Sequence, residues 1–457
     1  MPGAGSHRRR RWAPGFLIGL ALVAAAAGGF AIAFRATLAL ALRAVAGAAN
    51  VVDAMAGAGI AARLAIPAVG ALAAGALARL VARRAGGGVG DVMEAVALGR
   101  ARLSLPATLI KSAASWCAIV TGGSLGREGP LIQVGGAAGH EIGAWLGLSA
   151  EERRVLIAAG TAAGFAAAYN TPLAAVAFVL EIVAGIVVID TIVPTLVATV
   201  IATAMTRAAV GAGPIYGTRT FVLASAGELA AFAAVAAVCA VVAVGFTQLV
   251  QLAERAFRRR RLPAPWRQAL GGLGAGAIIA AVPEVAGNGY EPLGHILDGG
   301  SAIAAVAVLL LAKAVATASS VGSGSPGGVF TPTLLIGGCT GYLVGAALAA
   351  LGLEVGPRGG YALVGMAAAI AAATHAPLMA AVLAFELSGD YAVVLPLVLA
   401  TALATALART LARDSIYTAE LRARGVAWEL TLEGRALAGE PGEAAGATGE
   451  RGPPRGP

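Results

Sequence analysis

Long apolar runs free of charged residues dominate the pattern of hydrophobic and polar positions. Runs that begin at Phe16, Leu64, Leu229 and Ala302 each reach the length of about 20 residues that crosses a bilayer. They are rich in Ala, Leu and Val, and they lack the alternation of apolar and polar residues that a transmembrane β-barrel needs. Because backbone groups in lipid must be paired internally, these runs predict helices. The sequence therefore predicts an all-α polytopic membrane protein.

Composition and charge placement support a membrane location. Hydrophobic residues make up 58% of the chain and charged residues 12%, about half the charged fraction of a soluble domain. The net charge of +9 comes largely from arginines that flank the apolar runs. These are Arg8–Arg11, Arg258–Arg261, and Arg409, Arg413, Arg422 and Arg424. By the positive-inside rule, both termini of this multi-pass cell-membrane protein are expected in the cytoplasm, and no nucleic-acid partner is expected.

The chain is expected to hold one membrane domain, residues 14–425, between a basic cytoplasmic N-terminus, residues 1–13, and a cytoplasmic tail. The run from Phe16 exceeds the apolar region of a signal peptide, so we expect a retained first helix. Residues 426–457 are rich in Gly, Pro, Glu and Arg, which predicts disorder. The three cysteines and four histidines lack the spacing of metal ligands or of a disulfide framework. No metal site or cofactor is predicted.

An internal repeat divides the membrane domain into halves at about 60–210 and 265–425. The only two lysines, Lys111 and Lys313, each precede a proline by 19 residues, Pro130 and Pro332, and a glycine-rich turn lies between. Further on, residues 166–173 match residues 371–378. Paired segments interrupted by Gly and Pro are a pointer to a transporter's binding site.

Each half also contains a single glutamate in a membrane segment, at the same distance after the second pair of matching stretches. Glu181 and Glu386 lie nine residues after Pro172 and Pro377. Their equivalence in the repeat favours a structural role for Glu181.

The segment Gly122–Pro130 carries the residues with the most specific chemistry. Pro130 favours a first helical turn, and the glycines before it permit a tight backbone turn. A helix beginning here directs free N–H groups into the membrane interior, where they attract anions. Gly322–Pro332 predicts a second helix start of the same kind, so the two segments together predict an anion site.

Glu128 lies within the first of these turns, where a carboxylate costs at least ~2.5 kcal/mol at membrane depth. One interpretation is a gate, an anion that competes for the site and leaves when protonated. The other is a structural carboxylate paired with Arg127. An enzyme would need a nucleophile with a base or clustered metal ligands, and no such motif is present, so no enzyme is predicted.

These residues also carry a resemblance. Gly126-Arg-Glu-Gly-Pro130 is identical to a signature of the CLC family of chloride channels and proton/chloride exchangers, and Gly328-Val-Phe-Thr-Pro332 is similar to a second signature, Gly-x-Phe-x-Pro. The motifs at 170–173, 287–291 and 415–417 follow in family order. The resemblance covers roughly residues 14–425. It implies about eighteen helices in two inverted repeats and a homodimer with one pathway per subunit.

The resemblance also implies residue roles. Glu128 is expected to be the gate, the backbone N–H groups of Val329 and Phe330 to bind the central anion, and the Tyr417 hydroxyl to close the pathway from the cytoplasm. Further positions fall in the first signature, Gly126–Pro130, and in a separate anion motif at Gly86–Gly90. The anion-binding positions expected there are Gly87, Gly88, Arg127 and Gly129.

Three departures from the family pattern qualify these expectations. Gly87 replaces the serine of the motif Gly-Ser-Gly-Ile-Pro, which leaves backbone N–H groups alone to contact the anion. Ile182 stands where exchangers commonly carry an inner proton-accepting glutamate. Many relatives end in paired CBS nucleotide-sensing domains, and the 33 residues after Arg424 are too few for one.

The lysines have two open interpretations: interior ion pairs or carbonyl caps, or positive charges that raise anion occupancy. The predicted function is passive or proton-coupled movement of chloride or a similar anion. Ile182 favours a channel or a weakly coupled transporter, with a strict exchanger as the alternative. A membrane enzyme or receptor on this scaffold is the alternative of a different class.

Overall fold

A computed structural model provides the structure of the protein. It describes residues 12–81, 88–97, 99, 103–185, 189–217, 219, 221, 225, 227–423, 425, 428–431 and 434–437. In this part of the chain α-helices account for nearly all regular structure, as predicted.

The helices fall into an N-terminal pair and two halves. The pair is α1 (Pro14–Ala46) and α2 (Val51–Gly57). The first half contains α3 (Ile60–Arg79), α4 (Val89–Ala97), α5 (Leu105–Val120), α6 (Glu128–Trp145), α7 (Ala150–Tyr169), α8 (Pro172–Phe178), the π-helical turn η1 (Val179–Ala184) and α9 (Ile189–Val210).

The second half begins after the long helix α10 (Glu228–Arg259). It contains α11 (Ala264–Ala281), the 3-10 turn η2 (Pro283–Val285), α12 (Tyr290–Leu297), α13 (Ile303–Gly322), α14 (Phe330–Ala350), α15 (Arg358–Thr374), α16 (Pro377–Ser388), α17 (Val394–Leu411) and α18 (Ile416–Ala423). The eighteen α-helices of the described residues agree with the predicted number.

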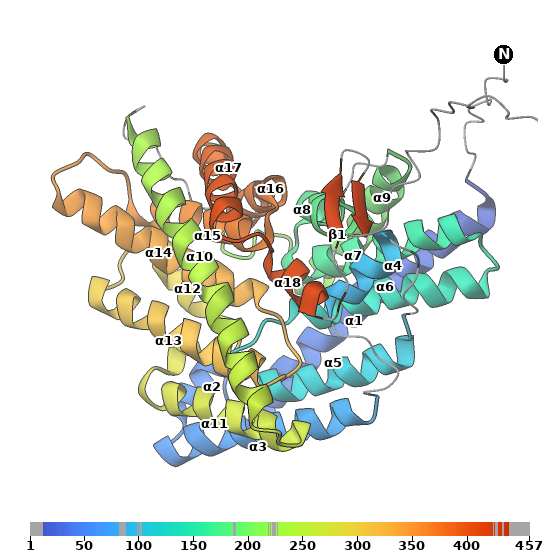
Figure 1. The fold of residues 1–457 in the computed structure, drawn as a ribbon, viewed down its shortest axis with the longest axis horizontal. Helices are drawn as coiled ribbons and strands as arrows, with labels where there is room; N and C mark the ends of the chain where they lie inside the picture. Colours follow the sequence, from blue (N-terminus) through green and yellow to red (C-terminus); the bar gives the residue numbers. More distant parts are fainter. Residues whose placement is uncertain are drawn as a thin grey trace, which may run out of the picture.

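The two halves have corresponding helices, as the repeat predicted. Figure 1 shows the first half toward the right and the second half toward the left, with α3 and α11 packed together at the bottom. Helix α6 packs on α7 in one half, and α14 packs on α15 in the other. The last residues of these second helices are followed by Asn170 and His375, which share a left-handed conformation with φ of 59°.

Glycines explain why α6 and α7 lie so close together. A Cβ atom at Gly135 would lie 2.0 Å from the carbonyl oxygen of Gly160. In the other half, a Cβ at Gly337 would lie 2.5 Å from the carbonyl oxygen of Gly365. Small residues at such contacts let helix backbones approach in the membrane, where lipid is as apolar as a side chain. These tight pairs hold the starts of α6 and α14 in fixed positions.

Seven helical segments in the described residues are long and apolar enough to cross a membrane. Other apolar helices are shorter: Leu105–Val120, Pro172–Ala184 and Pro377–Ser388. The protein is therefore a multi-pass membrane protein that also contains apolar helices too short to cross the membrane alone.

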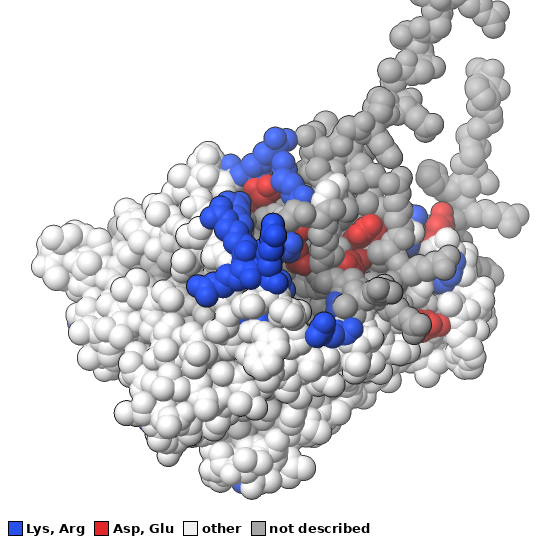
Figure 2. Space-filling model, turned by 60° about the horizontal axis from the view of Figure 1, so that its bottom comes forward, with Lys and Arg blue, Asp and Glu red and all other residues white. Residues whose placement is uncertain are grey.

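Exposed arginines are concentrated near the ends of a few helices. The C-terminal end of α10 and the segment around α17 and α18 carry exposed arginines, including Arg258, Arg409 and Arg422. Figure 2 shows basic side chains gathered in one area, while most of the described surface in that view is uncharged.

The predicted tail contains a short antiparallel hairpin, β1 (Trp428–Thr431) and β2 (Gly434–Leu437), with Trp428 opposite Leu437. Residues 438–457, and residues 1–11 at the other end, lie outside the described residues. The boundary after residue 425 stays a prediction.

Candidate functional site

The two glycine-rich loops predicted from the repeat meet at the centre of the molecule. The N–H of Gly126 donates to the carbonyl of Gly328 at 2.7 Å, and the N–H of Gly328 donates to the carbonyl of Gly126 at 2.8 Å. These residues are equivalent in the two halves and 202 positions apart. The antiparallel bridge brings the N-termini of α6 and α14 side by side.

Glu128, the first residue of α6, places its carboxylate on the N-terminus of α14. Oε1 accepts a hydrogen bond from the N–H of Phe330 at 3.0 Å, and Oε2 accepts one from the Thr331 hydroxyl at 2.9 Å. The side chain is 2% exposed. The carboxylate thus occupies the helix end that the sequence predicted for the anion.

Glycine is required at both bridge positions because the carboxylate fills the space around them. A Cβ atom at Gly328 would lie 1.8 Å from Oε1 of Glu128, and one at Gly126 would lie 2.2 Å from Oε2. Any larger residue would displace the carboxylate from α14. The two signature glycines therefore form the cradle of the Glu128 side chain.

Three of the predicted anion ligands, Gly129, Val329 and Phe330, gather around this carboxylate. Val329 is the residue before α14, and the N–H of Phe330 donates the hydrogen bond to Glu128. A Cβ atom at Gly129 would lie 3.9 Å from the backbone nitrogen of Gly328. The structure thus brings Glu128, Gly129, Val329 and Phe330 together.

Aromatic side chains enclose the site. The hydroxyls of Tyr169 and Thr331 lie 2.9 Å apart, and the Tyr169 ring centroid lies 5.5 Å from that of Phe330. Tyr417, on α18, is 7% exposed, and its ring packs edge-on against Phe178 at 6.4 Å. The sequence did not single out Tyr169 or Thr331, although both lie in or beside the quoted motifs.

The side chains of Arg127 and Glu128 point in different directions. The Arg127 guanidinium carbon lies 4.7 Å from the centroid of the Tyr290 ring, and the residue lines a separate cavity. The carboxylate of Glu128 is bound by α14 instead. The structural interpretation of Glu128 as the ion-pair partner of Arg127 is therefore wrong in this structure.

The third predicted anion loop is only partly described. Gly88 has a φ of 104°, and a Cβ atom there would lie 3.5 Å from the carboxylate oxygens of Glu420. The sequence did not single out Glu420, which lies one helical turn after Tyr417 on α18. Gly87 lies outside the described residues, so its role stays a prediction.

Lys313 is a carbonyl cap. It is 0% exposed, and its ammonium donates to the carbonyl oxygens of Val285 at 2.9 Å and Gly287 at 2.8 Å. The Gly287 carbonyl also accepts from the N–H of Leu125 in the first glycine-rich loop. Lys313 therefore positions that loop. Lys111 lies half-buried on α5, and its influence on the pathway stays a prediction.

Ile182 and Glu181 lie in the π-helical turn η1. Ile182 is 1% exposed. Both carboxylate oxygens of Glu181 accept backbone hydrogen bonds at the start of α16, from Leu378 at 3.1 Å and Met379 at 2.6 Å. Glu181 is thus engaged in joining the two halves.

Comparison with known proteins gives consistent matches over most of the chain. Residues 69–409 match the family described as voltage gated chloride channel. A putative ClcB-like chloride channel protein of Ralstonia nicotianae is 39% identical over 323 residues, which cover 69% of this chain and 75% of that protein. The voltage-gated ClC-type chloride channel ClcB of Escherichia coli is 33% identical over 320 residues, covering 68% and 76%.

Solved structures share the fold. A slow cyanobacterial Cl⁻/H⁺ antiporter superposes with a TM-score of 0.77 at 25% identity, covering 91% of this chain and 99% of that one. A CLC-type fluoride/proton antiporter gives a TM-score of 0.68 at 22% identity, covering 88% and 97%. With the paired glycine loops, the carboxylate between them and these matches, the chain belongs to the CLC family of voltage gated chloride channels and transporters.

Proposed function

We propose that this protein moves chloride or a similar small anion across the membrane along a pathway gated by Glu128. The observation that carries the proposal is the position of the Glu128 carboxylate on the N-terminus of α14. A helix N-terminus binds anions through its free N–H groups and its dipole. A permeant anion and the ionised carboxylate therefore compete for the same donors.

Energetics favour a bound but releasable carboxylate. A carboxylate at membrane depth costs at least ~2.5 kcal/mol. Each hydrogen bond to a charged group returns about 1.5–3 kcal/mol, and Glu128 accepts two. Two such bonds return about 3–6 kcal/mol, the same order as the cost of burying the charge, and protonation weakens the hold of α14 on the side chain because it removes the charge that these bonds stabilise. An anion can then occupy the donors and still leave, because no fixed full charge holds it there.

We further propose that proton coupling is weak or absent. A coupled pathway needs protonatable groups along its length. Glu128 serves one part of such a path. Ile182 is buried and carries no proton, and the Glu181 carboxylate is engaged on α16. The second candidate is a strict proton/chloride exchanger, and the 25% identical cyanobacterial antiporter favours it.

The test is flux from proteoliposomes of the purified protein, with chloride and pH recorded together. A chloride gradient is imposed without a pH gradient, and an ionophore clamps the potential. Chloride flux without proton movement at a fixed ratio is expected. Uphill proton movement at a fixed ratio would establish the exchanger. Absence of any anion flux would overturn the proposal and favour a membrane enzyme or receptor.

We also propose a homodimer with both termini in the cytoplasm. Apolar side chains on α8 and α16 are exposed on the single chain, including Leu173 at 52% and Leu378 at 56%. A second copy or lipid would cover them. The exposed arginines after α10 and α17 support the cytoplasmic side through the positive-inside rule.

A further inference from the structure

A cavity of about 470 Å³ lies beside the gate and has a different character from it. Its walls come from α1, the start of α2, the C-terminal ends of α5 and α9, the loop before α6, and the start of α12 with the loop before it. Arg127, the residue directly before Glu128, is one of the lining residues. The cavity therefore adjoins the gate through the residue that precedes Glu128.

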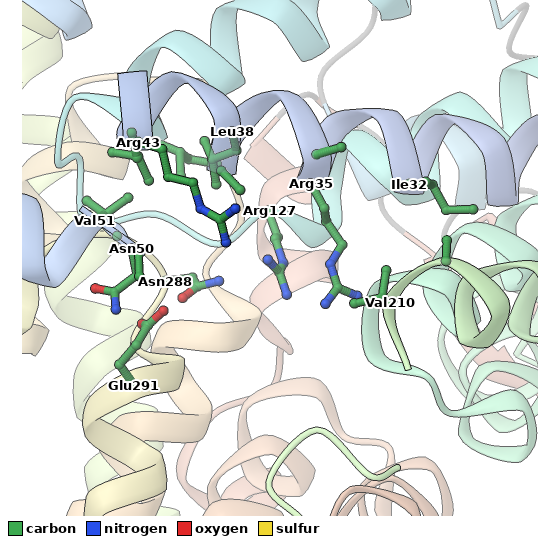
Figure 3. Close-up of a pocket in the computed structure, with 17 residues that line it drawn as sticks. Ile32, Arg35, Leu38, Arg43, Asn50, Val51, Arg127, Val210, Asn288 and Glu291 are labelled. Carbon is green, nitrogen blue, oxygen red and sulfur yellow. The ribbon is translucent and has the colours of Figure 1, made fainter. Parts of the chain in front are cut away.

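Three guanidinium groups point into this cavity. Figure 3 shows Arg35 and Arg43 extending from α1, and Arg127 from the loop before α6, into a common space. Among the described residues of the lining Glu291 is the one carboxylate, so three positive charges against one negative leave a net +2. Figure 3 shows the guanidinium groups of Arg35 and Arg127 beside each other.

These arginines lack the counter-charge that usually accompanies such a cluster. Ion pairs among the described residues include Arg219 with Asp298, Arg258 with Glu254 and Arg422 with Asp414. Within that part of the chain, Arg35, Arg43 and Arg127 have no carboxylate at ion-pair distance, and Nε of Arg127 is buried without a hydrogen-bond partner. Guanidinium groups without an ion pair among the described residues, gathered around one cavity of net positive charge, indicate a site for an anion from solution.

The geometry of the donors indicates the class of anion. Guanidinium presents planar, paired N–H donors that match the oxygens of carboxylates, sulfate and phosphate. A chloride ion is a single spherical acceptor and lacks the paired oxygens that the two parallel N–H donors of a guanidinium match. A net +2 is balanced by a divalent anion.

We propose that this cavity binds a divalent inorganic oxyanion, sulfate or phosphate, between Arg35, Arg43 and Arg127, and that the bound oxyanion obstructs chloride on its way to Glu128. The consequence for flux rests on the proposed function, whereas the binding does not.

Binding is tested by thermal unfolding of the purified protein in detergent. Sulfate or phosphate should raise the melting temperature, because a ligand that binds only the folded state stabilises it. Isethionate at equal ionic strength and chloride at equal concentration are the comparison anions. Arg43→Gln, at the exposed end of α1, and Arg35→Gln should each require about tenfold more sulfate for the same shift. The matched control is Arg258→Gln, which removes an exposed arginine far along the sequence and should keep the wild-type response.

Obstruction is tested by chloride flux from proteoliposomes with sulfate on both sides. Sulfate should slow chloride flux in the wild type and in Arg258→Gln, and the inhibition should weaken about tenfold in Arg43→Gln. Equal stabilisation by sulfate and isethionate, or an unchanged sulfate response in both cavity variants, would overturn the site. Stabilisation by chloride as strong as that by sulfate would overturn the oxyanion assignment. A protein that binds sulfate but passes no chloride would instead refute the proposed function.

Discussion

Glu181 and Glu386 each cap the helix that carries the other. Glu181, in the turn that continues α8, accepts hydrogen bonds from Leu378 and Met379 at the start of α16. Glu386, on α16, accepts from Leu173 at 3.1 Å and Ala174 at 2.8 Å at the start of α8. A carboxylate at a helix N-terminus satisfies free N–H groups and complements the dipole. The pair thus joins the two halves of the repeat.

This arrangement predicts that Glu181 contributes to stability and not to proton movement. Glu181→Gln should lower the free energy of unfolding by about 1–2 kcal/mol, the scale of a lost helix cap. Glu386→Gln should have a similar effect, because the contacts are equivalent, while Glu254→Gln on the surface should have little. Thermal unfolding in detergent measures the loss. A Glu181→Gln variant with normal stability but altered proton movement would identify Glu181 as a proton relay instead.

Glu128→Gln should keep chloride flux and lose its pH dependence. The amide cannot ionise, so it no longer competes with the anion for the N–H of Phe330. Chloride flux from proteoliposomes between pH 4 and pH 8, roughly spanning the titration of a carboxyl group, provides the measurement. The Glu254→Gln variant is the control and should retain the wild-type profile. A Glu128→Gln variant with that same profile would show that another group is the gate.

Thr331→Val should raise chloride flux at neutral pH. The hydroxyl of Thr331 donates to Oε2 of Glu128, so its loss weakens the hold of α14 on the carboxylate. A hydrogen bond to a charged group is worth about 1.5–3 kcal/mol, which corresponds to an increase of about tenfold to a hundredfold in the ratio of open to closed gates. Thr333→Val is a matched control, because the Thr333 hydroxyl donates within its own helix to Val329. Equal flux in the two variants would argue against a role for the Thr331 contact in gating.

Ile182→Glu should introduce or strengthen proton movement with chloride. Ile182 is buried in the π-helical turn, and a carboxyl group there would supply the protonatable group that the proposed pathway lacks. Ile182→Gln has the same size without a titratable proton and should remain uncoupled. Simultaneous chloride and pH recordings compare the variants. Strict coupling in the wild type would remove the premise of this prediction.

The sequence alone determined the fold class and the location of the gate region. Apolar run length predicts membrane helices because it depends on bilayer thickness and not on neighbours. Gly and Pro around Glu128 predict broken helices for an equally local reason, and the repeat of Lys111 and Lys313 predicts two halves. These signals are read from residues a few positions apart.

Tertiary structure alone decided which groups face one another. The bridge between Gly126 and Gly328 joins residues 202 positions apart, and no local pattern shows that Glu128 lies on α14 rather than beside Arg127. The sequence also left the role of Lys313 undecided, because a lysine that caps carbonyl groups and a lysine that attracts anions can occur in the same sequence pattern. The convergence of Arg35 with Arg127 depends on how α1 packs across the glycine loop. The physical reason is the same in each case: hydrogen bonds and charges act over a few ångströms in space, and the packing of distant helices sets those distances.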